Sequence, residues 1–262
     1  MISSGGVRVD GLEGRVVVVA GGGGGTGRAT ARLLGASGAR VVVGDIDVDR
    51  AEEVAAAIRA GGGEAVAVAF DMGDPASSAA LIGTAVERYG RLDGLHNVAG
   101  NPAAHRHDGD VVSTPDGTWD LQLRSHLLAY AATCRTAIPL MLDGGGGSIV
   151  NTSSNAARGA GTTRIAYQAA KAGVETLTRH VAATWGKRGV RCNALSYGVV
   201  LTDNARAQLS PAFLAAALAQ TWSPRLGEPD DVAGLAALLL SDAGAWINGQ
   251  VIDVNGGMLL TG

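Results

Sequence analysis

Short apolar runs alternate with helix-forming segments along this chain of 262 residues. The first run, residues 16–19, is all valine and is followed by glycines, which is typical of a strand buried on both faces of a parallel sheet. Strands separated by helices of about ten to fifteen residues predict βαβ units. The other strands are expected at residues 41–43, 64–70, 92–98, 148–152, 190–195 and 250–254. This pattern predicts one α/β domain over residues 1–262, a Rossmann-type, doubly wound, seven-stranded parallel sheet.

Helices are expected in the intervals between these strands. Their ranges are 28–37, 50–60, 76–89, 118–142, 164–185 and 230–240. Two segments do not fit the alternation: residues 101–117 have the composition of a loop, and residues 202–224 enclose a short apolar helix at 212–218. Because both segments follow strands, they are expected at the carboxyl edge of the sheet, where open α/β sheets bind ligands. The second segment is the expected substrate lid.

Five consecutive glycines open the connection between the first strand and the first helix. Gly22, Gly24 and Gly27 fit the spacing G-x-G-x-x-G. Gly21, Gly25 and Gly27 fit G-x-x-x-G-x-G. Glycines at this place let backbone N–H groups approach a pyrophosphate at the start of a helix. A glycine-only motif is a weak signal in a chain with 40 glycines, so the position after the first strand is what favours a dinucleotide over a permissive turn.

Asp45 ends the second predicted strand. A carboxylate there accepts hydrogen bonds from ribose hydroxyls and repels a 2′-phosphate. Residues 22–24 and 44–48 contain no Arg or Lys to bind such a phosphate, which favours NAD over NADP. The alternative is that Asp45 caps the next helix, a role for which Asp47 and Asp49 compete.

Ser154, Tyr167 and Lys171 are the most informative polar residues. Tyr167 and Lys171 are four residues apart in a predicted helix, so the phenol and the amine share one helical face. A cation within a few ångström lowers the pKa of a phenol from its usual value of about 10, which suits tyrosine to proton transfer. Ser154 is expected to hydrogen-bond the substrate oxygen that Tyr167 protonates or deprotonates. The alternative is an exposed helix with an incidental aromatic–cation contact.

These motifs resemble those of the short-chain dehydrogenase/reductase family over residues about 12–258. The glycine motif of that family falls on Gly21, Gly25 and Gly27, with Ala20 where threonine is usual. Its Asn-Asn-Ala-Gly segment is similar to residues 97–100, which differ from it at the second position.

The resemblance implies a role for each residue of the site. Tyr167 is the general acid/base, Lys171 binds the nicotinamide ribose and lowers the pKa of Tyr167, and Ser154 polarises the substrate carbonyl. The nicotinamide itself carries the hydride. The predicted cofactor contacts are Gly21, Gly24, Gly25, Thr26, Gly27, Asp45, Ile46, Asp71, Met72, Asn97, Ala99, Gly100, Tyr167, Lys171, Val200 and Thr202.

Two positions depart from the family pattern. His126 stands where an asparagine usually completes the catalytic group. A neutral imidazole both donates and accepts, so His126 is expected to hold, beside Lys171, the water that the asparagine would hold. If His126 titrates, it is expected to add a limb to the pH profile of activity near pH 6–7. The alternative is a histidine that satisfies a core hydrogen bond. Tyr197 stands where proline usually precedes Gly198, and it is expected to form a wall of the substrate pocket.

The predicted activity is NAD(H)-dependent oxidation of a secondary alcohol, or reduction of a ketone. The lid contains Phe213, Leu214, Leu218 and Trp222, which predicts an apolar substrate. A 3-oxoacyl thioester reductase is the alternative enzyme, although the lid lacks the basic cluster that a carrier protein would need. A dinucleotide-binding protein without turnover is the alternative outside enzymes. Residues 105–108, His-Arg-His-Asp, are expected to form a solvated loop and no metal site.

Composition restricts the partners and the compartment. The net charge is −3 and no basic stripe occurs, so no nucleic-acid partner is expected. Cys134 and Cys192 fit no metal or redox spacing, which suits a reducing compartment. No signal peptide or membrane span is evident in the sequence, and the protein is expected in the cytoplasm. The resemblance implies a homo-oligomer, a dimer or tetramer, and small residues of the last long helix would permit close helix packing between subunits: Ala169, Ala170, Ala172 and Gly173.

Overall fold

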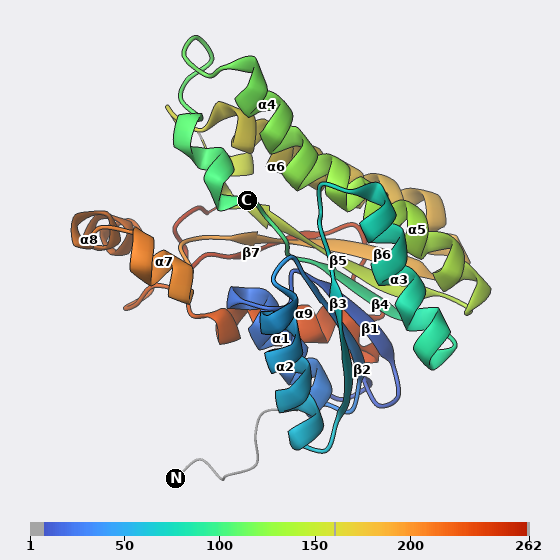
Figure 1. Cartoon of the computed structure of the whole chain (residues 1–262). Helices are drawn as coiled ribbons and strands as arrows, with labels where there is room; N and C mark the ends of the chain where they lie inside the picture. The colour runs from blue at the N-terminus through green and yellow to red at the C-terminus, as the bar shows by residue number, and fades with distance from the viewer. Residues whose placement is uncertain (1–7, 160, 261–262) are drawn as a thin grey trace, which may run out of the picture.

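A computed structural model describes residues 8–159 and 161–260. Its centre is one sheet of seven parallel strands in the order β3-β2-β1-β4-β5-β6-β7 (Figure 1). The strands are β1 Val16–Ala20, β2 Arg40–Asp45, β3 Glu64–Ala69, β4 Gly94–Asn97, β5 Gly147–Ser154, β6 Val190–Tyr197 and β7 Val251–Val254. The predicted doubly wound, seven-stranded parallel sheet is confirmed.

Helices cover both faces of this sheet. Figure 1 shows α1, α2 and α9 on one face and α3, α5 and α6 on the other. The first group is α1 Gly25–Ala36, α2 Val48–Ala60 and α9 Pro229–Leu240. The second group is α3 Pro75–Tyr89, α5 Ala129–Asp143 and α6 Ile165–Trp185.

The valine run of β1 explains why the sheet has two cores. Every residue of β1 is buried, and successive side chains of a strand point to opposite faces. Val17 and Val19 join the core beneath α1 and α9, whereas Val16 and Val18 join the core beneath α3 and α5. A strand that feeds two cores needs apolar residues at every position, which is the pattern predicted for it.

The helix predicted at residues 118–142 is interrupted. It consists of α4 Asp116–Leu123, a π-helical turn η2 Arg124–Leu128, and α5. A π turn inserts one residue into the i→i−4 ladder, and such turns concentrate at functional sites. The apolar periodicity of the sequence does not reveal this insertion. The turn carries His126 at its centre.

The two irregular segments lie beyond the carboxyl ends of the strands, where the sequence placed them. Residues 101–117 include a 3-10 helix, η1 Pro102–His107. Residues 202–224 hold α7 Asp203–Gln208, which was not predicted, and α8 Pro211–Ala219, which was. Figure 1 shows α7 and α8 extending away from the sheet. Among the described residues, no helix has the length and hydrophobicity to cross a membrane.

Candidate active site

The site lies where two neighbouring strands are followed by helices on opposite faces of the sheet. β1 and β4 are adjacent in the sheet, yet α1 follows β1 on one face and α5 comes after β4 on the other. Such a switch point opens a crevice at the carboxyl edge, which is the usual ligand site of an open α/β sheet.

The glycine turn forms one wall of this crevice. A Cβ on Gly27 would lie 1.9 Å from the carbonyl oxygen of Gly21, and a Cβ on Gly21, whose φ is 97°, would lie 2.5 Å from the nitrogen of Ala99. Only glycine allows this close packing of strand, turn and helix. Gly24 is the N-cap residue of α1 and makes no side-chain capping bond, and its own Cβ would meet nothing within 4 Å. The first N–H groups of α1 are therefore available to an anion, and Thr26 lies among them.

Asp45 faces the same turn from the end of β2. Its carboxylate accepts from the N–H groups of Gly23 at 2.9 Å and Asp47 at 3.1 Å. The N-cap of α2 is Asp47, whose side chain accepts from the nitrogen of Arg50. The alternative role of Asp45 as a helix cap is therefore excluded. Ile46 follows it and is 76% exposed.

The next two predicted contacts lie after β3. Asp71 is exposed and accepts from the nitrogen of Gly73 at 2.8 Å, while Met72 is half-buried against the core. Both follow the carboxyl end of their strand, as Asp45 does.

Asn97 differs from the other predicted cofactor contacts, because its side chain is fully buried. Its amide nitrogen donates to Asn151 at 2.8 Å and its oxygen accepts from Thr133 at 2.8 Å. It therefore holds β4, β5 and α5 together, and its side chain does not reach the crevice. Ala99 and Gly100 are nearer to the opening: Ala99 is half-buried and Gly100 is exposed.

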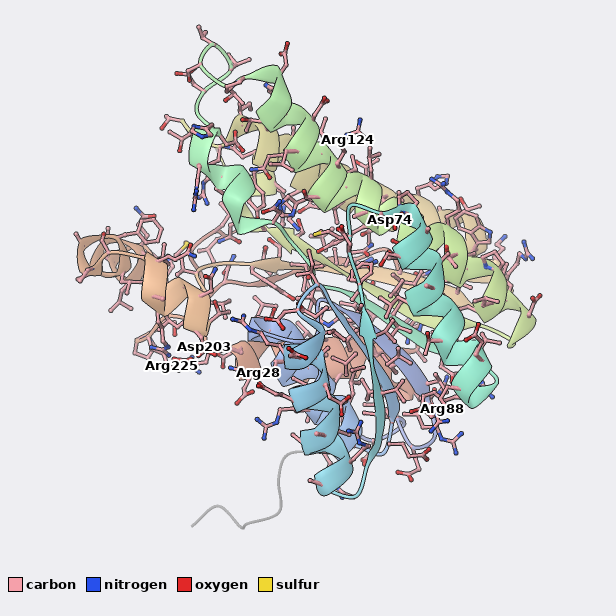
Figure 2. All side chains as sticks on the ribbon, viewed as in Figure 1. Arg28, Asp74, Arg88, Arg124, Asp203 and Arg225 are labelled. Carbon is pink, nitrogen blue, oxygen red and sulfur yellow. The ribbon has the colours of Figure 1, made fainter. Side chains whose placement is uncertain are left out.

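The segment after β6 lies against the glycine turn. A Cβ on Gly25 would lie 2.9 Å from the methyl carbon of Thr202. Val200 forms a bridge to Gly227 and packs against the core. Arg28 of α1 and Asp203 of α7 form an ion pair of 2.5 Å, and Figure 2 shows the two side chains next to each other. The lid is thus tied to the helix that starts at the glycine turn.

Ser154, Tyr167 and Lys171 come together on the other side of the crevice. Ser154 ends β5, and its hydroxyl lies near enough to Tyr167 of α6 to lower the pKa of the phenol. Lys171 lies one helical turn further, with Nζ 5.8 Å from the centre of the Tyr167 ring. Nζ donates to the carbonyl oxygen of Thr152 at 2.7 Å. The three side chains thus converge, as their spacing predicted.

Burial dominates the electrostatics of this group. It raises the pKa of Tyr167, and the neighbouring hydroxyl of Ser154 and the charge of Arg164 only partly offset this effect. Burial also lowers the pKa of Lys171 to about 7. A buried amine with a pKa near 7 loses part of its charge at neutral pH, and Nζ donates to Thr152. That Lys171 lowers the pKa of Tyr167 when the cofactor is bound stays a prediction.

Asp108 was expected in a solvated loop, and this was wrong. Its carboxylate is buried and accepts from the nitrogens of Ala166 at 3.0 Å and Tyr167 at 2.9 Å. It also accepts from Nε2 of Gln122 at 2.9 Å. Asp108 therefore caps the first turn of α6 from another part of the chain and orients the backbone at Tyr167. Local capping signals cannot show a cap that lies 58 residues upstream of the helix.

Arg164 precedes α6 with a φ of 62°, the only positive φ of a non-glycine residue in residues 8–159 and 161–260. Its nitrogen donates to the carbonyl oxygen of Asp108 at 3.0 Å. Its guanidinium carbon lies 5.9 Å from the centre of the Tyr167 ring. The left-handed backbone is thus held by Asp108, and it turns the chain into α6 beside the reactive tyrosine.

Two histidines flank the ring of Tyr167. His126 lies 5.1 Å from it and His105 lies 4.7 Å from it, both nearly perpendicular. His126 is buried, and neither of its ring nitrogens has a hydrogen-bond partner among the described residues. Burial, with Lys171 and His105 as further causes, lowers the pKa of His126 to about 2. This low pKa makes His126 neutral at physiological pH, so no limb near pH 6–7 is expected from its titration.

His105 is held by the same network that holds Asp108. Nε2 of Gln122 lies 3.2 Å from Nδ1 of His105. An amide nitrogen only donates, so Nδ1 accepts and the ring proton is on Nε2. Sequence reasoning missed His105 as part of the site because the 3-10 helix that brings it to Tyr167 has no periodic signal. Among the described residues, no group of three or more His, Cys, Asp or Glu is arranged to hold a metal ion.

Comparison with known proteins identifies the family of this chain. Residues 21–259 match the family described as Enoyl-(Acyl carrier protein) reductase. A probable short-chain type dehydrogenase/reductase of Bradyrhizobium diazoefficiens is 38% identical over 94% of this chain and 88% of its own length. A 7alpha-hydroxysteroid dehydrogenase of Bacteroides fragilis is 34% identical over 95% of both chains. A solved 7 alpha-hydroxysteroid dehydrogenase, complexed with NADH and 7-oxo glycochenodeoxycholic acid, has a TM-score of 0.89, 30% identity and 98% coverage of both chains.

The fold and the site together define a dinucleotide-dependent oxidoreductase. The chain belongs to the short-chain dehydrogenase/reductase family. It transfers hydride between NAD(H) and a secondary alcohol or ketone. The glycine turn leaves space that a Cβ would fill, and the carboxylate of Asp45 faces the same turn. Both features fit that cofactor.

Proposed function

We propose that Tyr167 exchanges a proton with the oxygen of an apolar secondary alcohol or ketone. The observation that carries this proposal is the convergence of Ser154, Tyr167 and Lys171 on the crevice beside the glycine turn. NAD, when bound, supplies the hydride acceptor, or NADH the hydride. Ser154 donates a hydrogen bond to the substrate oxygen, which holds it within reach of the phenol of Tyr167.

Lys171 and His126 complete the site in this proposal. Lys171 is buried and uses one hydrogen of Nζ on the carbonyl of Thr152, which leaves two hydrogens for the ribose of the cofactor. His126 is neutral, and both of its nitrogens are free among the described residues to bind a water beside Lys171. A proton from solvent would then reach Tyr167 through uncharged groups.

The proposed cofactor contacts follow the crevice from end to end. The amide groups of Gly24, Gly25 and Thr26 bind the pyrophosphate at the start of α1. Asp45 binds the ribose hydroxyls, with Ile46 and Asp71 around the adenine. Val200 and Thr202 lie over the turn and bind the carboxamide end.

The lid supports an apolar substrate. Phe213, Leu218 and Trp222 of the lid are 44%, 40% and 84% exposed, which is unusual for large apolar side chains. Relatives of this chain include hydroxysteroid and cis-4-hydroxycyclohexanecarboxylate dehydrogenases, whose names describe ring alcohols. We propose a cyclic secondary alcohol or ketone as the substrate class.

The lid does not support a carrier-bound thioester. The one arginine of the lid, Arg206, pairs with Glu228, and Arg225, which follows the lid, pairs with Asp231. A carrier protein presents an acidic surface and a phosphate, which need unpaired cations. The thioester reductase therefore remains the second candidate.

We also propose a cytoplasmic homo-oligomer. Both cysteines are free and buried, as suits a reducing compartment. Ala169 and Ala172 are half-buried on α6 and would allow close contact between subunits. Gly173 does not contribute to such a contact, because its Cβ would lie 2.7 Å from Leu127 of the same chain.

The test is a two-stage assay with purified protein. NADH binding is measured by fluorescence, and turnover is then measured with a panel of cyclic and open-chain alcohols with NAD and the matching ketones with NADH. Turnover that is highest for apolar ring substrates is expected. NADH binding without turnover on any member of the panel would support the non-catalytic alternative. Preference for NADPH, or for acyl thioesters, would overturn the cofactor or the substrate assignment respectively.

A further inference from the structure

Arg164 immediately precedes α6, and its backbone is strained. Its φ is 62°, and every other positive φ in residues 8–159 and 161–260 belongs to a glycine. A left-handed backbone costs energy for an arginine and almost none for a glycine. The chain contains 40 glycines, yet it has a long cationic side chain at this position. Because such strain is concentrated at functional sites, the side chain of Arg164 is a candidate for a function.

Hydrogen bonds on both sides of Arg164 hold this strained backbone. The nitrogen of Arg164 donates to the carbonyl oxygen of Asp108 at 3.0 Å. The nitrogen of Ile165 donates to the carbonyl oxygen of Gly109 at 3.2 Å. The carbonyl oxygen of Arg164 accepts from the nitrogen of Gln168 at 3.0 Å. The direction in which the side chain of Arg164 leaves the backbone is therefore fixed by the fold.

The guanidinium of Arg164 lies beside the reactive tyrosine. Its central carbon is 5.9 Å from the centre of the Tyr167 ring, and Arg164 is exposed. Among the described residues, no carboxylate lies within ion-pair distance of this guanidinium. An unpaired arginine is ordinary on a protein surface. Arg164 differs from the other arginines of the described ranges because it lies over the ring of Tyr167.

The carboxylate of Asp108 is close in the structure to this segment but is already engaged. Its oxygens accept from the nitrogens of Ala166 and Tyr167 and from Nε2 of Gln122. Asp108 is also buried, whereas the side chain of Arg164 is exposed. Asp108 therefore orients the backbone of Arg164 without forming an ion pair with the guanidinium, whose charge stays available to an anion.

A guanidinium is suited to bind a carboxylate, because it offers two parallel N–H donors to the two oxygens. A cyclic substrate whose carbinol oxygen lies at Tyr167 extends away from the phenol. The ring then separates the carbinol carbon from a carboxylate by several ångström, which is comparable with the distance of 5.9 Å between the Tyr167 ring and the guanidinium carbon. The apolar side chains of the lid would cover the ring, while Arg164 would hold the acid group.

We propose that Arg164 is a specificity-determining residue that binds a carboxylate of the substrate, which is then a cyclic secondary alcohol, or its ketone, with an acid group. The inference rests on the proposed function, in which the oxygen of a cyclic substrate lies at Tyr167. The carboxylate takes no part in the reaction. Hydride and proton leave the carbinol as before, and the acid group fixes the position of the ring.

The first test compares acid and neutral substrates in the wild type and in Arg164→Asn. The substrates are hydroxycyclohexane carboxylates and the matching primary amides, which are similar in size and differ in charge. The measured quantity is the ratio of kcat/KM for the acid to kcat/KM for the amide, because an effect of Arg164 on the pKa of Tyr167 cancels in this ratio. Arg164→Asn is expected to lower the ratio about 10- to 100-fold, through loss of a charge-assisted pair. An unchanged ratio would overturn the proposal.

Two controls separate recognition from structure and from net charge. Asparagine adopts a left-handed backbone more readily than arginine, so the melting temperature of Arg164→Asn is expected to be no lower than that of the wild type. A lower melting temperature together with an unchanged ratio would show a purely structural role. Arg88→Gln removes the same charge at the far end of α3 (Figure 2), and its ratio should stay within about 2-fold of the wild type because distant surface charges are screened. An equal fall of the ratio in Arg88→Gln would contradict the assignment to Arg164.

Binding to the NADH complex tests the proposal without turnover. Cyclohexane carboxylate and cyclohexane carboxamide have no ring oxygen to react, and calorimetry measures their affinity for protein saturated with NADH. The wild type is expected to bind the carboxylate at least about 10-fold more tightly than the amide, and Arg164→Asn to lose this difference. Equal affinities in the wild type would overturn the proposal.

The outcomes distinguish this proposal from the proposed activity. Wild-type protein that binds the carboxylate preferentially but oxidises no ring alcohol would contradict the proposed activity and support the carboxylate site. Wild-type protein that oxidises neutral and acidic ring alcohols equally well, with the same ratio in Arg164→Asn, would support the proposed activity and overturn the role of Arg164.

Discussion

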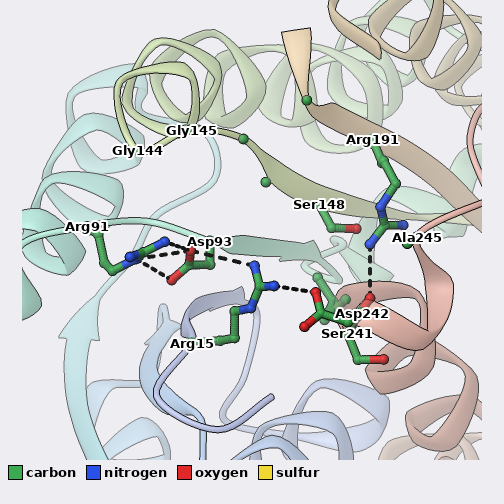
Figure 3. Close-up of a pocket in the computed structure, with 14 residues that line it drawn as sticks. Arg15, Arg91, Asp93, Gly144, Gly145, Ser148, Arg191, Ser241, Asp242 and Ala245 are labelled. Carbon is green, nitrogen blue, oxygen red and sulfur yellow. Dashed lines mark hydrogen bonds and ion pairs between the residues drawn. The ribbon is translucent and has the colours of Figure 1, made fainter. Parts of the chain in front are cut away.

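At both edges of the sheet, a run of glycines lies beside charged side chains, yet the two edges use these groups differently. The amino edge holds a cavity of about 210 Å³ lined by residues 144–147 and by three arginines (Figure 3). There, Arg91 pairs with Asp93 at 2.6 Å, and Arg15 contacts Asp93 and Asp242. Arg191 donates to the carbonyl oxygens of Leu239 and Ser241. At this edge each arginine thus has partners within the fold, which are carboxylates for Arg15 and Arg91 and carbonyl oxygens for Arg191.

At the carboxyl edge, two buried groups beside Tyr167 lack such partners. Among the described residues, Lys171 forms no ion pair, and neither nitrogen of His126 is hydrogen-bonded. An unpartnered imidazole alone does not mark a site, because His96 also lacks partners and is buried inside the sheet. The difference is that His126 and Lys171 both lie against the ring of Tyr167. A charged group that is paired within the fold can contribute to its stability. A buried polar group without a partner lowers stability but is available to bind a ligand.

The contrast between the two edges predicts that the residues of the carboxyl edge carry out the reaction. Tyr167→Phe removes the proton donor and is expected to lower kcat about 10²- to 10⁴-fold, or about 3–5 kcal/mol of barrier. NADH affinity should change little, because the glycine turn is untouched. Steady-state kinetics and NADH fluorescence check both parts. Activity above about a tenth of the wild type would move the proton transfer elsewhere.

The amino edge should affect stability and not activity. Asp93 is buried, accepts from the nitrogen of Val16 at 2.9 Å, and pairs with Arg91 and Arg15. Asp93→Asn removes the charge that these arginines face, and the expected loss is about 2–3 kcal/mol of unfolding free energy, since Arg91 is half-exposed. Urea unfolding measures the loss, while kcat and KM at 25 °C should match the wild type. A lowered kcat with an unchanged free energy of unfolding would contradict the assignment of the amino edge to stability alone.

The burial of Lys171 at the carboxyl edge is expected to lower the stability of the folded protein. Its pKa falls from 10.5 in the unfolded chain to about 7 in the folded protein. The folded state therefore binds fewer protons than the unfolded state between these values, so the stability of the wild type rises with pH from about 7 to 10.5. Lys171→Met lacks this gain. Its stability relative to the wild type is expected to be highest at pH 6 and to fall by about 2 kcal/mol by pH 9.

The measurement is urea unfolding of both proteins at pH 6, 7.5 and 9. Lys187→Met is the matched control, because the side chain of Lys187 is exposed. A constant difference between Lys171→Met and wild type across pH would contradict the buried, weakly charged lysine.

Asp108 is expected to affect both stability and activity, because its carboxylate is hydrogen-bonded and lies at the carboxyl edge. Asp108→Asn keeps one acceptor oxygen but loses the second contact to α6, and a capping loss of about 1–2 kcal/mol is expected. kcat should fall about 10-fold, because the backbone at Tyr167 loses its N-cap. Asp110→Asn is the control: Asp110 is exposed and accepts from Val112 and Ser113 in its own turn. If both variants behave alike, the cap does not orient Tyr167.

His126 gives the smallest expected effect. With a pKa of about 2 the ring is neutral throughout the working range, so His126→Asn should retain most activity and leave the acid limb of the pH profile unchanged. Rates at saturating substrate from pH 5 to 9 measure this. A shifted acid limb in the variant would show that His126 titrates near neutral pH.

Much of the fold and part of the site could be predicted from the sequence. The valines of β1, the glycines at Gly21–Gly27 and the spacing of Tyr167 and Lys171 are local patterns, and each depends on neighbours a few residues away. The cap of α6 by Asp108, the π turn at His126 and the approach of His105 depend on segments far apart in the chain. Periodicity contains no information about such contacts.

The sequence by itself determined the sheet, the dinucleotide turn and the pairing of Tyr167 with Lys171, because alternation, glycine and helical spacing act within one element or between successive ones. Only the tertiary structure decided the charge state of Lys171 and Tyr167, the burial of Asp108 and Asn97, and the left-handed backbone of Arg164. The physical reason is that a pKa or a hydrogen-bond partner depends on what surrounds the group after folding. Those surroundings come from residues on other strands and helices.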